Sequence, residues 1–346
     1  MRLVPRALFG WSAAGLCLAV LSGCAAIGPA PDSSGAGNAA AGASVPSPEE
    51  RPRLPTPPSP ESQALAVQFA KVEADLRGRG LLRTDRGGPD APFDARILAD
   101  NFIRIALFDE FVPVAGHLVA QETSSRLRRW QDPVRINLEF GDSVSDAQRK
   151  TDTTTATDLI HRLASASGHD ISVVPEGGNM SVFVVNEDER LTLGPRLRAA
   201  MPGITADVIS NIRQMPASTF CVVIAFSTES EPYVYRRAVA VIRAEHPPLL
   251  RRSCFDEEIT QGLGLANDSS LVRPSIFNDD EEYALLTRQD ELMLRILYDP
   301  RLRPGMNAAE AQPIVQDIAQ ELLPDASSAS AEPRPEPDVL AAQGKG

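Results

Sequence analysis

The sequence predicts an α+β fold, with a mixed sheet followed by C-terminal helices, from three observations. Positions 134–140 alternate apolar and polar residues with the two-residue period of a half-buried strand. An unbroken apolar run at 220–226 and a β-prone run at 233–243 predict two further strands. Elsewhere, apolar residues recur at the three- and four-residue spacing of helices. Together these patterns favour one medium-sized domain.

The two ends of the chain differ in composition from its middle. Of the 346 residues, 43% are apolar, which is enough for a sizeable core. Residues 24–60 are mostly Ala, Gly, Ser and Pro and cannot bury enough apolar surface to offset their chain entropy. This range is therefore predicted to be a disordered tether, and residues 324–346, of similar composition, a disordered tail.

Residues 1–23 have the features of a secretion signal. Two arginines precede an apolar run at 7–20 that is too short to span a bilayer stably. The signal ends in Leu-Ser-Gly-Cys, which resembles the bacterial lipobox. That resemblance implies that Cys24 is lipidated, with palmitate as a typical acyl group, and anchors the protein. Since Ala25 stands where Asp would favour the inner membrane, we expect the periplasmic face of the outer membrane. The alternative is an ordinary signal cleaved near Cys24.

The charge of the chain excludes one class of partner. The formal net charge is −12, and loss of the signal's two arginines makes the mature chain more acidic. An acidic surface opposes long-range attraction to nucleic acid, so no nucleic-acid partner is expected. Arginine clusters at 126–129 and 251–252 could bind a carboxylate or phosphate, or could stand in solvent or pair with nearby acidic residues.

Two cysteines, Cys221 and Cys254, remain when Cys24 takes the lipid and the signal is removed. Two thiols in an oxidising compartment predict a disulfide. Such a bond would tie a strand to a helix and stabilise the fold by about 3 to 4 kcal/mol in the chain-entropy model. A nucleophilic Cys254 is the alternative, but the adjacent Asp256 and Glu257 oppose thiolate formation.

Residues 61–126 are predicted to form a helical N-terminal extension. Apolar residues at helical spacing predict a helix at 62–76, followed by a glycine-rich break at 78–88. Asp94 then begins a second helix that is expected to run toward Phe111.

Residues 127–323 are predicted to hold the α+β domain. After the first strand, helical spacing predicts a helix at 155–166. Two short β runs, 171–174 and 181–185, are separated by Gly-rich turn residues and are expected to form a hairpin. Residues 191–213 have helical spacing that is interrupted at Pro202-Gly203.

The second half of this domain is expected to contain a central strand and two final helices. The apolar run at 220–226 predicts a strand covered on both faces. Thr287 caps a helix with Asp290 three residues further on, and a last helix is expected at 308–323.

The most informative stretch is 254–278, which reads CFDEEITQGLGLANDSSLVRPSIFN. On a helix, at about 100° per residue, Glu257, Gln261 and Gly264 share one narrow sector opposite the apolar residues. A two-faced helix is therefore predicted, with one side against the core. Gly264 is expected to end it in a conformation that favours glycine.

The spacing of this stretch resembles the metzincin metalloprotease motif, H-E-x-x-H-x-x-G-x-x-H, in which three histidines bind zinc and Glu is the general base. Glu257, Gln261 and Asn267 stand at the three histidine positions. Glu258 stands at the position of the base and Gly264 at that of the glycine. The resemblance implies a zincin-like mixed sheet with an equivalent of the active-site helix.

The zinc ligands of that motif are all replaced, so no metal and no cofactor are expected. Zinc prefers imidazole and thiolate to amide oxygens, and Phe277 also stands where the methionine of the Met-turn would lie. One expectation is that Gln261 and Asn267 hydrogen-bond each other or Glu257 in the space of the metal. A less specific alternative is a calcium site formed by the oxygens of Glu257, Gln261 and Asn267. Further ligands could come from Asp256, Asp268, Asp279 and Asp280.

Residues 127–306 as a whole are similar to a family of uncharacterised lipoproteins of proteobacteria that share a domain of unknown function, DUF2927. The strings EEITQGLGLANDS, PSIFND and LYDPRLRPGM carry this resemblance. It implies a family but no activity.

Two functions therefore stay open. The favoured one is a membrane-anchored lipoprotein whose non-catalytic, metalloprotease-like domain binds or scaffolds an envelope protein or peptide. The strand at 181–185 is a candidate edge for main-chain pairing with such a peptide. The alternative is an envelope hydrolase without a typical zinc site, in which Glu258 works with Glu257 or Asp268 as acid and base. Adjacent residues on a helix point about 100° apart, which opposes the pair of Glu257 with Glu258.

Overall fold

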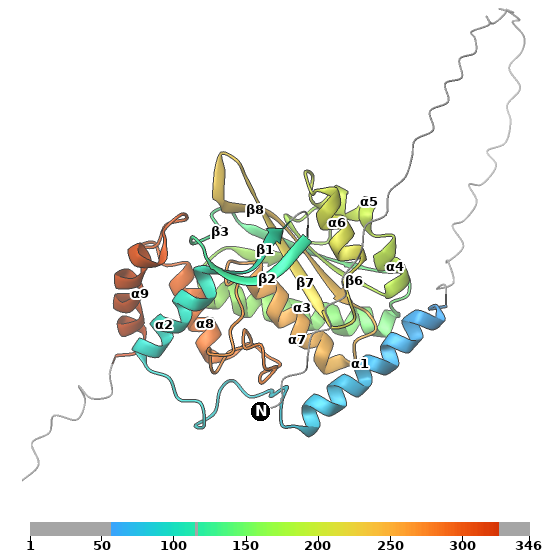
Figure 1. Cartoon of the computed structure of the whole chain (residues 1–346), viewed down its shortest axis with the longest axis horizontal. Helices are drawn as coiled ribbons and strands as arrows, with labels where there is room; N and C mark the ends of the chain where they lie inside the picture. The colour runs from blue at the N-terminus through green and yellow to red at the C-terminus, as the bar shows by residue number, and fades with distance from the viewer. Residues whose placement is uncertain (1–56, 115–116, 325–346) are drawn as a thin grey trace, which may run out of the picture. The chain divides into compact units, whose positions relative to one another are not determined.

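A mixed six-stranded sheet with helices on both faces forms the centre of the protein (Figure 1). The α+β class is therefore confirmed. The structure is a computed structural model that describes residues 57–114 and 117–324. The predicted signal with Cys24, nearly all of the predicted tether and the predicted tail beyond residue 324 lie outside the described residues.

One long strand organises the sheet. The strands are β3 (Arg129–Trp130), β4 (Val134–Phe140), β5 (Ile171–Val173), β6 (Met180–Val185), β7 (Cys221–Thr228) and β8 (Glu231–Arg243). They follow the order β5-β4-β6-β8-β7, and β3 pairs with the first half of β8. All pairings are parallel except that of β7, which runs antiparallel to β8 along its outer side.

The predicted hairpin between 171–174 and 181–185 is wrong. β5 pairs with one side of β4 and β6 with the other, and both run parallel to it. The loop between them therefore crosses β4, and it does so at close range. A Cβ on Gly178 would lie 2.3 Å from the carbonyl oxygen of Arg135, so only glycine fits there. The glycines of this segment therefore allow the loop to cross close to β4. The sequence pattern of such a crossing loop is the same as that of a hairpin turn.

The central strand of this sheet is β6, and β7 is an edge strand. All six residues of β6 are buried between β4 and β8, so the expectation that 181–185 offers a free edge is wrong. The prediction of a central strand at 220–226 is also wrong, because β8 is the one partner of β7 among the described strands and most residues of β7 are half-buried. An apolar run reports burial of the two faces of a strand, and it carries no information about its neighbours.

Two helical layers cover the sheet. On one face, α3 (Asp146–Ser167), α7 (Pro248–Gln261) and α8 (Arg288–Leu297) contribute to the larger core. α2 (Ala95–Ala106) and α9 (Ala308–Leu322) pack on each other and contribute to the same core. Short helices cover the opposite face and enclose a second core around Phe183 and Val241. The remaining helices of the described residues are α1 (Pro60–Gly78), α4 (Glu187–Leu191), α5 (Gly194–Ala200) and α6 (Ala206–Arg213).

The predicted helices are present, although α3 starts earlier than expected. α3 begins at Asp146, capped by Ser145, because its first turns are polar and show no apolar period. It ends at Gly168, whose φ of 68° is the left-handed conformation that favours glycine. The capping box of Thr287 with Asp290 is present at the start of α8.

The segment before the sheet contains a hairpin that the sequence did not predict. α2 ends at Ala106, and β1 (Phe108–Val114) and β2 (His117–Ser124) follow as an antiparallel pair. The expectation that this helix runs toward Phe111 is therefore wrong. Apolar residues at 105, 107, 108 and 111 continue the helical spacing past the true helix end, so periodicity alone does not show where the strand begins.

The predicted disulfide between Cys221 and Cys254 is confirmed. Its Cα atoms lie 5.9 Å apart, and it joins the first residue of β7 to the middle of α7. The 33-residue separation closes a loop that contains the whole β7–β8 hairpin. The bond therefore fixes α7 beneath the edge of the sheet.

We predict that the double variant Cys221→Ala/Cys254→Ala unfolds with a free energy about 3 to 4 kcal/mol lower than that of the oxidised protein, because the unfolded chain regains the entropy of the closed loop. Urea unfolding followed by circular dichroism measures this difference. An unchanged unfolding free energy would show that the bond adds nothing to stability.

Candidate functional site

The α7 helix, which carries most of the predicted site, is buried more completely than a two-faced helix. Phe255 and Ile259 have no exposed surface, as predicted for the core side. Glu258 is also buried, with 3% of its surface exposed, whereas Glu257 and Gln261 are half-buried. The predicted polar side is therefore reduced to a narrow strip on α7.

The end of α7 is held tightly against the strands above it. The indole N–H of Trp130 donates a hydrogen bond of 2.8 Å to the carbonyl oxygen of Gly262. Gly264 has a φ of 126°, and a Cβ there would lie 2.3 Å from the carbonyl oxygen of Arg128. Both the conformation and the close approach require glycine at this position. The prediction that Gly264 ends the helix is wrong, because α7 ends at Gln261 and Gly262 is its C-cap.

The amide side chains predicted to replace zinc ligands bind separate partners. The Gln261 amide donates to the Asp268 carboxylate at 2.9 Å. Asn267 is 1% exposed, and its side-chain amide donates to the carbonyl oxygen of Arg104 on α2, also at 2.9 Å. The structure thus brings Gln261 together with Asp268 and directs the Asn267 amide toward α2.

The predicted acidic residues of α7 lie close together at the disulfide. Cys221, Glu257 and Glu258 each offer one atom, and these atoms lie within 4.8 Å of one another. Among the described residues, this is the group of His, Cys, Asp and Glu with metal-like spacing. Cys221 is bonded to Cys254 and offers no thiolate, so the set does not fit zinc. It also omits all four aspartates considered for calcium.

Two further carboxylates are buried behind this group, where they serve the backbone. Asp256 accepts the N–H of Leu286 at 2.9 Å, and burial raises its pKa from 3.8 to about 6. Burial also raises the pKa of Asp290, although its oxygens accept hydrogen bonds from Ser275 and Thr287. Asp256 therefore holds the loop before α8.

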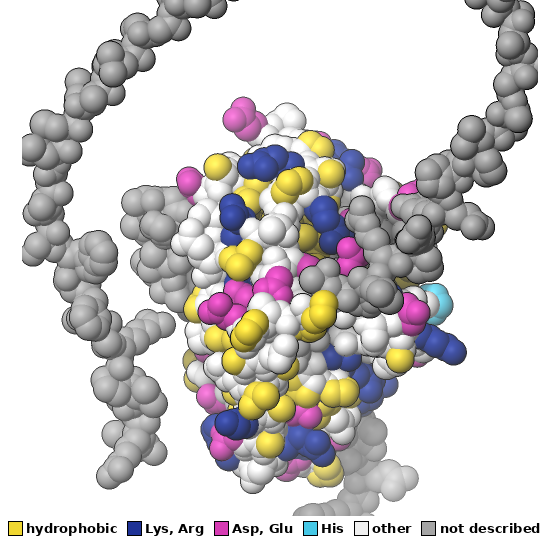
Figure 2. Space-filling view, turned by 90° about the vertical axis from the view of Figure 1, so that its right-hand side faces the viewer, with side chains coloured by type: hydrophobic (Ala, Val, Ile, Leu, Met, Phe, Trp, Pro, Cys, Tyr) yellow, Lys and Arg dark blue, Asp and Glu magenta, His cyan; other side chains and the backbone are white. Residues whose placement is uncertain are grey.

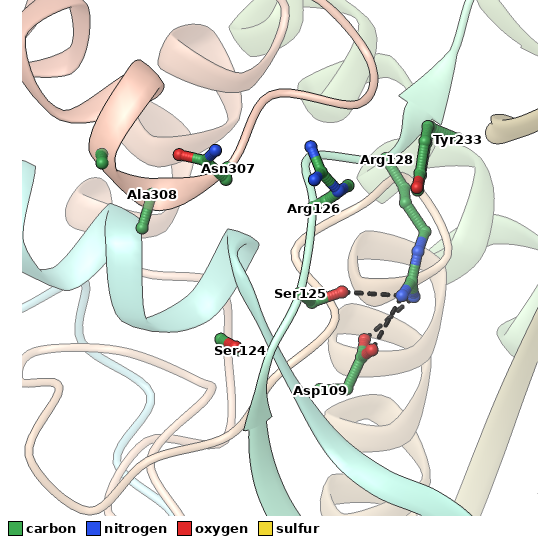
Figure 3. A pocket seen from close by; sticks show the side chains of 9 residues that line it. Asp109, Ser124, Ser125, Arg126, Arg128, Tyr233, Asn307 and Ala308 are labelled. Carbon is green, nitrogen blue, oxygen red and sulfur yellow. Dashed lines mark hydrogen bonds and ion pairs between the residues drawn. The ribbon is translucent and has the colours of Figure 1, made fainter.

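An open cavity of about 490 Å³ lies near the end of α7, and we call it the Arg126 pocket (Figure 3). Arg128 shows this position, since it lines the pocket and its carbonyl oxygen lies against Gly264, just after α7. Four elements contribute the remaining lining: the base of the β1–β2 hairpin, the segment before β3, the start of β8 and the start of α9. The lining includes Asp109, Ser125, Tyr233 and Asn307.

The charges that line the Arg126 pocket do not cancel. Arg128 donates two hydrogen bonds to the two oxygens of Asp109, at 2.9 and 2.7 Å, and one to Ser125 (Figure 3). Burial lowers the pKa of Arg128, but the interactions with Asp109 and Tyr235 together outweigh this effect and raise it. Arg126 donates to the carbonyl oxygen of Gly305 and lies over the Tyr233 ring, 5.9 Å from its centre. Arg126 is thus the lining cation that remains beyond this neutral pair.

The sequence identified the two arginine clusters without showing which arginine faces a cavity. In the first cluster, Arg128 pairs with Asp109, and Arg129 donates to main-chain carbonyl oxygens after α8. In the second, Arg251 pairs with buried Asp152 at 2.9 Å. Like Arg129, Arg126 has no ion pair with a carboxylate of the described residues, and it differs from Arg129 because it lines the cavity. Only its position beside Tyr233 and α9 identifies it, and no sequence signal does.

The chain matches a known protein family. A family model described as a protein of unknown function (DUF2927) matches residues 95–317. The match begins at the first residue of α2, so it includes the hairpin and the Arg126 pocket as well as the sheet. No curated protein matches the chain. In the described part of the chain, no helix has the length and apolar character needed to cross a membrane.

We predict that Asp256→Asn raises the unfolding free energy at pH 8 by about 2 to 3 kcal/mol, because the buried charge disappears while the side-chain oxygen still accepts the Leu286 N–H. The folded-state pKa of Asp256, about 6, lies above the unfolded value of 3.8. In the wild type this group therefore costs stability above pH 6, and the cost disappears as the pH falls toward 4.

Urea unfolding at pH 5 and pH 8 checks this effect. Asp75→Asn on α1, where the side chain is 69% exposed, is the matched control and should change neither value. Equal effects of the two substitutions at pH 8 would contradict the assignment.

Proposed function

The chain belongs to the DUF2927 family of proteins of unknown function, and on that premise we propose that it is a lipid-anchored protein of the cell envelope that binds a peptide or protein partner without cutting it. The Arg126 pocket is the binding site in this proposal, and a carboxylate of the partner is the group it receives.

The observation that carries this proposal is the unbalanced guanidinium in an open cavity. A carboxylate that enters the pocket can form charge-assisted hydrogen bonds with Arg126, which are stronger than neutral ones. Tyr233 adds an apolar face beside the charge. Ser124, Arg126 and Ala309 are exposed at the rim, so the cavity suits a group that protrudes from a larger partner.

The surroundings of the pocket favour binding over chemistry. Among the described residues, the lining carboxylate is that of Asp109. Both of its oxygens are bound by Arg128, so it is poorly placed to accept a proton from a substrate. In the region of α7, the Asp268 carboxylate accepts a hydrogen bond from the Gln261 amide, and Cys221 is held in the disulfide. Hydrolysis requires a general base or a thiolate that can reach the substrate, and none of these three groups is placed to act as one.

The location at the envelope is supported by features of the sequence and by the disulfide. Leu-Ser-Gly-Cys at 21–24 supports lipidation of Cys24, and Ala25 supports the periplasmic face of the outer membrane. A structural disulfide fits an oxidising compartment. On the face shown in Figure 2, basic and acidic side chains are interspersed with apolar ones. A nucleic-acid partner would instead call for a continuous basic surface.

A second candidate, an envelope hydrolase that uses Glu258, is favoured by one observation. Atoms of Glu257 and Glu258 lie within 4.8 Å of each other although the residues are adjacent on a helix. Carboxylates this close can share a proton and divide the roles of acid and base. The burial of Glu258 argues against direct access to a substrate.

For the binding proposal, we predict that the full chain retains peptides with a free carboxylate from a synthetic library and returns them uncut. Arg126→Gln should weaken this binding at least about tenfold, because it removes a hydrogen bond between charged groups and such a bond contributes at least this factor to affinity. Arg96→Gln, an equal change of charge at a 73% exposed position on α2, should not weaken it.

The library experiment also separates the two candidate functions. Mass spectrometry of the recovered peptides shows whether any bond has been cut. Cleavage that disappears in Glu258→Gln would replace the binding proposal with the hydrolase. Equal binding by the wild type and the Arg126 variant would show that the peptide does not bind in the Arg126 pocket.

For the anchor, we predict that cells fed radiolabelled palmitate incorporate it into the wild-type protein, which then fractionates with the outer membrane. Cys24→Ala should remove the label and release the protein from the membrane fraction. An unlabelled wild-type protein in the soluble periplasmic fraction would refute lipid anchoring.

A further inference from the structure

A second cavity, of about 230 Å³, lies on the opposite face of the sheet from α7. We call it the Asn137 pocket. On this face, Phe183 and Val241 belong to the second core, and the cavity begins where the apolar rows stop. α5 forms one wall, through Arg196, Ala199 and Ala200.

The floor of the Asn137 pocket is a pair of buried polar side chains. Asn137 on β4 and Ser181 on β6 are direct neighbours in the sheet and are 4% and 3% exposed. Ser181 donates to the Asn137 side-chain oxygen at 3.0 Å, and the Asn137 amide donates to Glu139 at 3.2 Å. An amide group has two N–H donors and a hydroxyl oxygen two lone pairs, so this floor can make more hydrogen bonds than these two.

Polar residues on the inner strands of a sheet are unusual enough to need a reason. Burying a polar group costs free energy that an apolar residue of the same size would avoid. The polar side chains of Asn137 and Ser181 lie at the cavity. Two residues further along β6, where the cavity has ended, apolar Phe183 belongs to the second core. A polar ligand in the cavity accounts for this placement.

Small residues keep the Asn137 pocket open. Gly177 has a φ of 68°, and a Cβ on Gly178 would lie 2.7 Å from the Asn137 side-chain oxygen. Ala199 and Ala200 line the wall formed by α5. Larger side chains at these four positions would fill the space above the polar floor.

The charges around the Asn137 pocket leave one cation without a carboxylate. Arg196 pairs with Glu139 at 3.0 Å and lies over the Phe183 ring, 5.1 Å from its centre. Arg237 donates to the carbonyl oxygen of Gly178 at 3.0 Å. No ion pair joins Arg237 to a carboxylate of the described residues, so the lining has one net positive charge.

We propose that the Asn137 pocket binds a small carboxylate that also carries an amide or hydroxyl group. The carboxylate pairs with Arg237, and the amide or hydroxyl group bonds with Asn137 and Ser181. The cavity is smaller than the roughly 300–1,000 Å³ that holds a drug-sized ligand, so the ligand is small or is the end of a chain. This inference is independent of the Arg126 pocket and of the binding function proposed there.

A ligand-observed NMR titration of the full chain with N-acetylalanine tests the proposal, because this probe carries one carboxylate and one amide. We expect N-acetylalanine to bind to the wild type. The neutral N-acetylalaninamide, which lacks the carboxylate, should not bind. Arg237→Gln should weaken binding at least about tenfold, and Ser181→Ala by about three- to tenfold. Circular dichroism confirms that each variant is folded.

Arg135→Gln is the matched control, because Arg135 lies on β4 near the pocket, pairs with Asp170 at 2.8 Å and does not line the cavity. It should leave the affinity unchanged. No binding of N-acetylalanine to the wild type would overturn the proposal, as would equal losses in the Arg237 and Arg135 variants.

A longer probe distinguishes the two sources of such a carboxylate. N-acetyl-trialanine that binds as well as N-acetylalanine identifies the end of a peptide as the ligand. If only the shorter probe binds, the ligand is a free small molecule. Both outcomes support the assigned chemistry.

Discussion

The packing of α7 against the sheet is the constraint on which both the fold and the proposed binding site depend. Cys254, in the middle of the helix, is bonded to the first residue of β7. Its C-terminal end accepts a hydrogen bond from Trp130 on β3, and Gly264 lies against the carbonyl oxygen of Arg128. These contacts fix the segment 126–130, so the guanidinium of Arg126 is positioned by the end of a helix that contributes no side chain to the pocket.

Much of the fold follows from sequence periodicity, and the errors show its physical limit. The helices and the strands β4 and β8 were predictable because burial of one face imposes a regular spacing. The pairing of β5 and β6 with opposite sides of β4 was not, because a Gly-rich loop fits a crossing as well as a turn. The edge position of β7 was also hidden, since its apolar residues report the helices above and below it and not the number of its neighbours.

The sites were less predictable than the fold because they depend on which residues meet in space. The spacing of 254–268 led to Gln261 and Asn267, but not to the partners of their amides, Asp268 and the Arg104 carbonyl oxygen. Asn137 and Ser181 are 44 residues apart in the chain and become neighbours only through the register of β4 with β6. Composition identified an arginine cluster, and only the structure separates Arg126 from the arginines around it.

Recognition without hydrolysis, through the Arg126 guanidinium, is the central claim. The most direct measurement is the NMR signal of the arginine side chains in the full chain during addition of a carboxylate-terminated peptide. If Arg126 binds the carboxylate, its resonance moves and the peptide remains intact. The Arg128 resonance stays in place, because both branches of that guanidinium already bind Asp109. An unmoved Arg126 resonance, or fragments of the peptide in the sample, would contradict this claim.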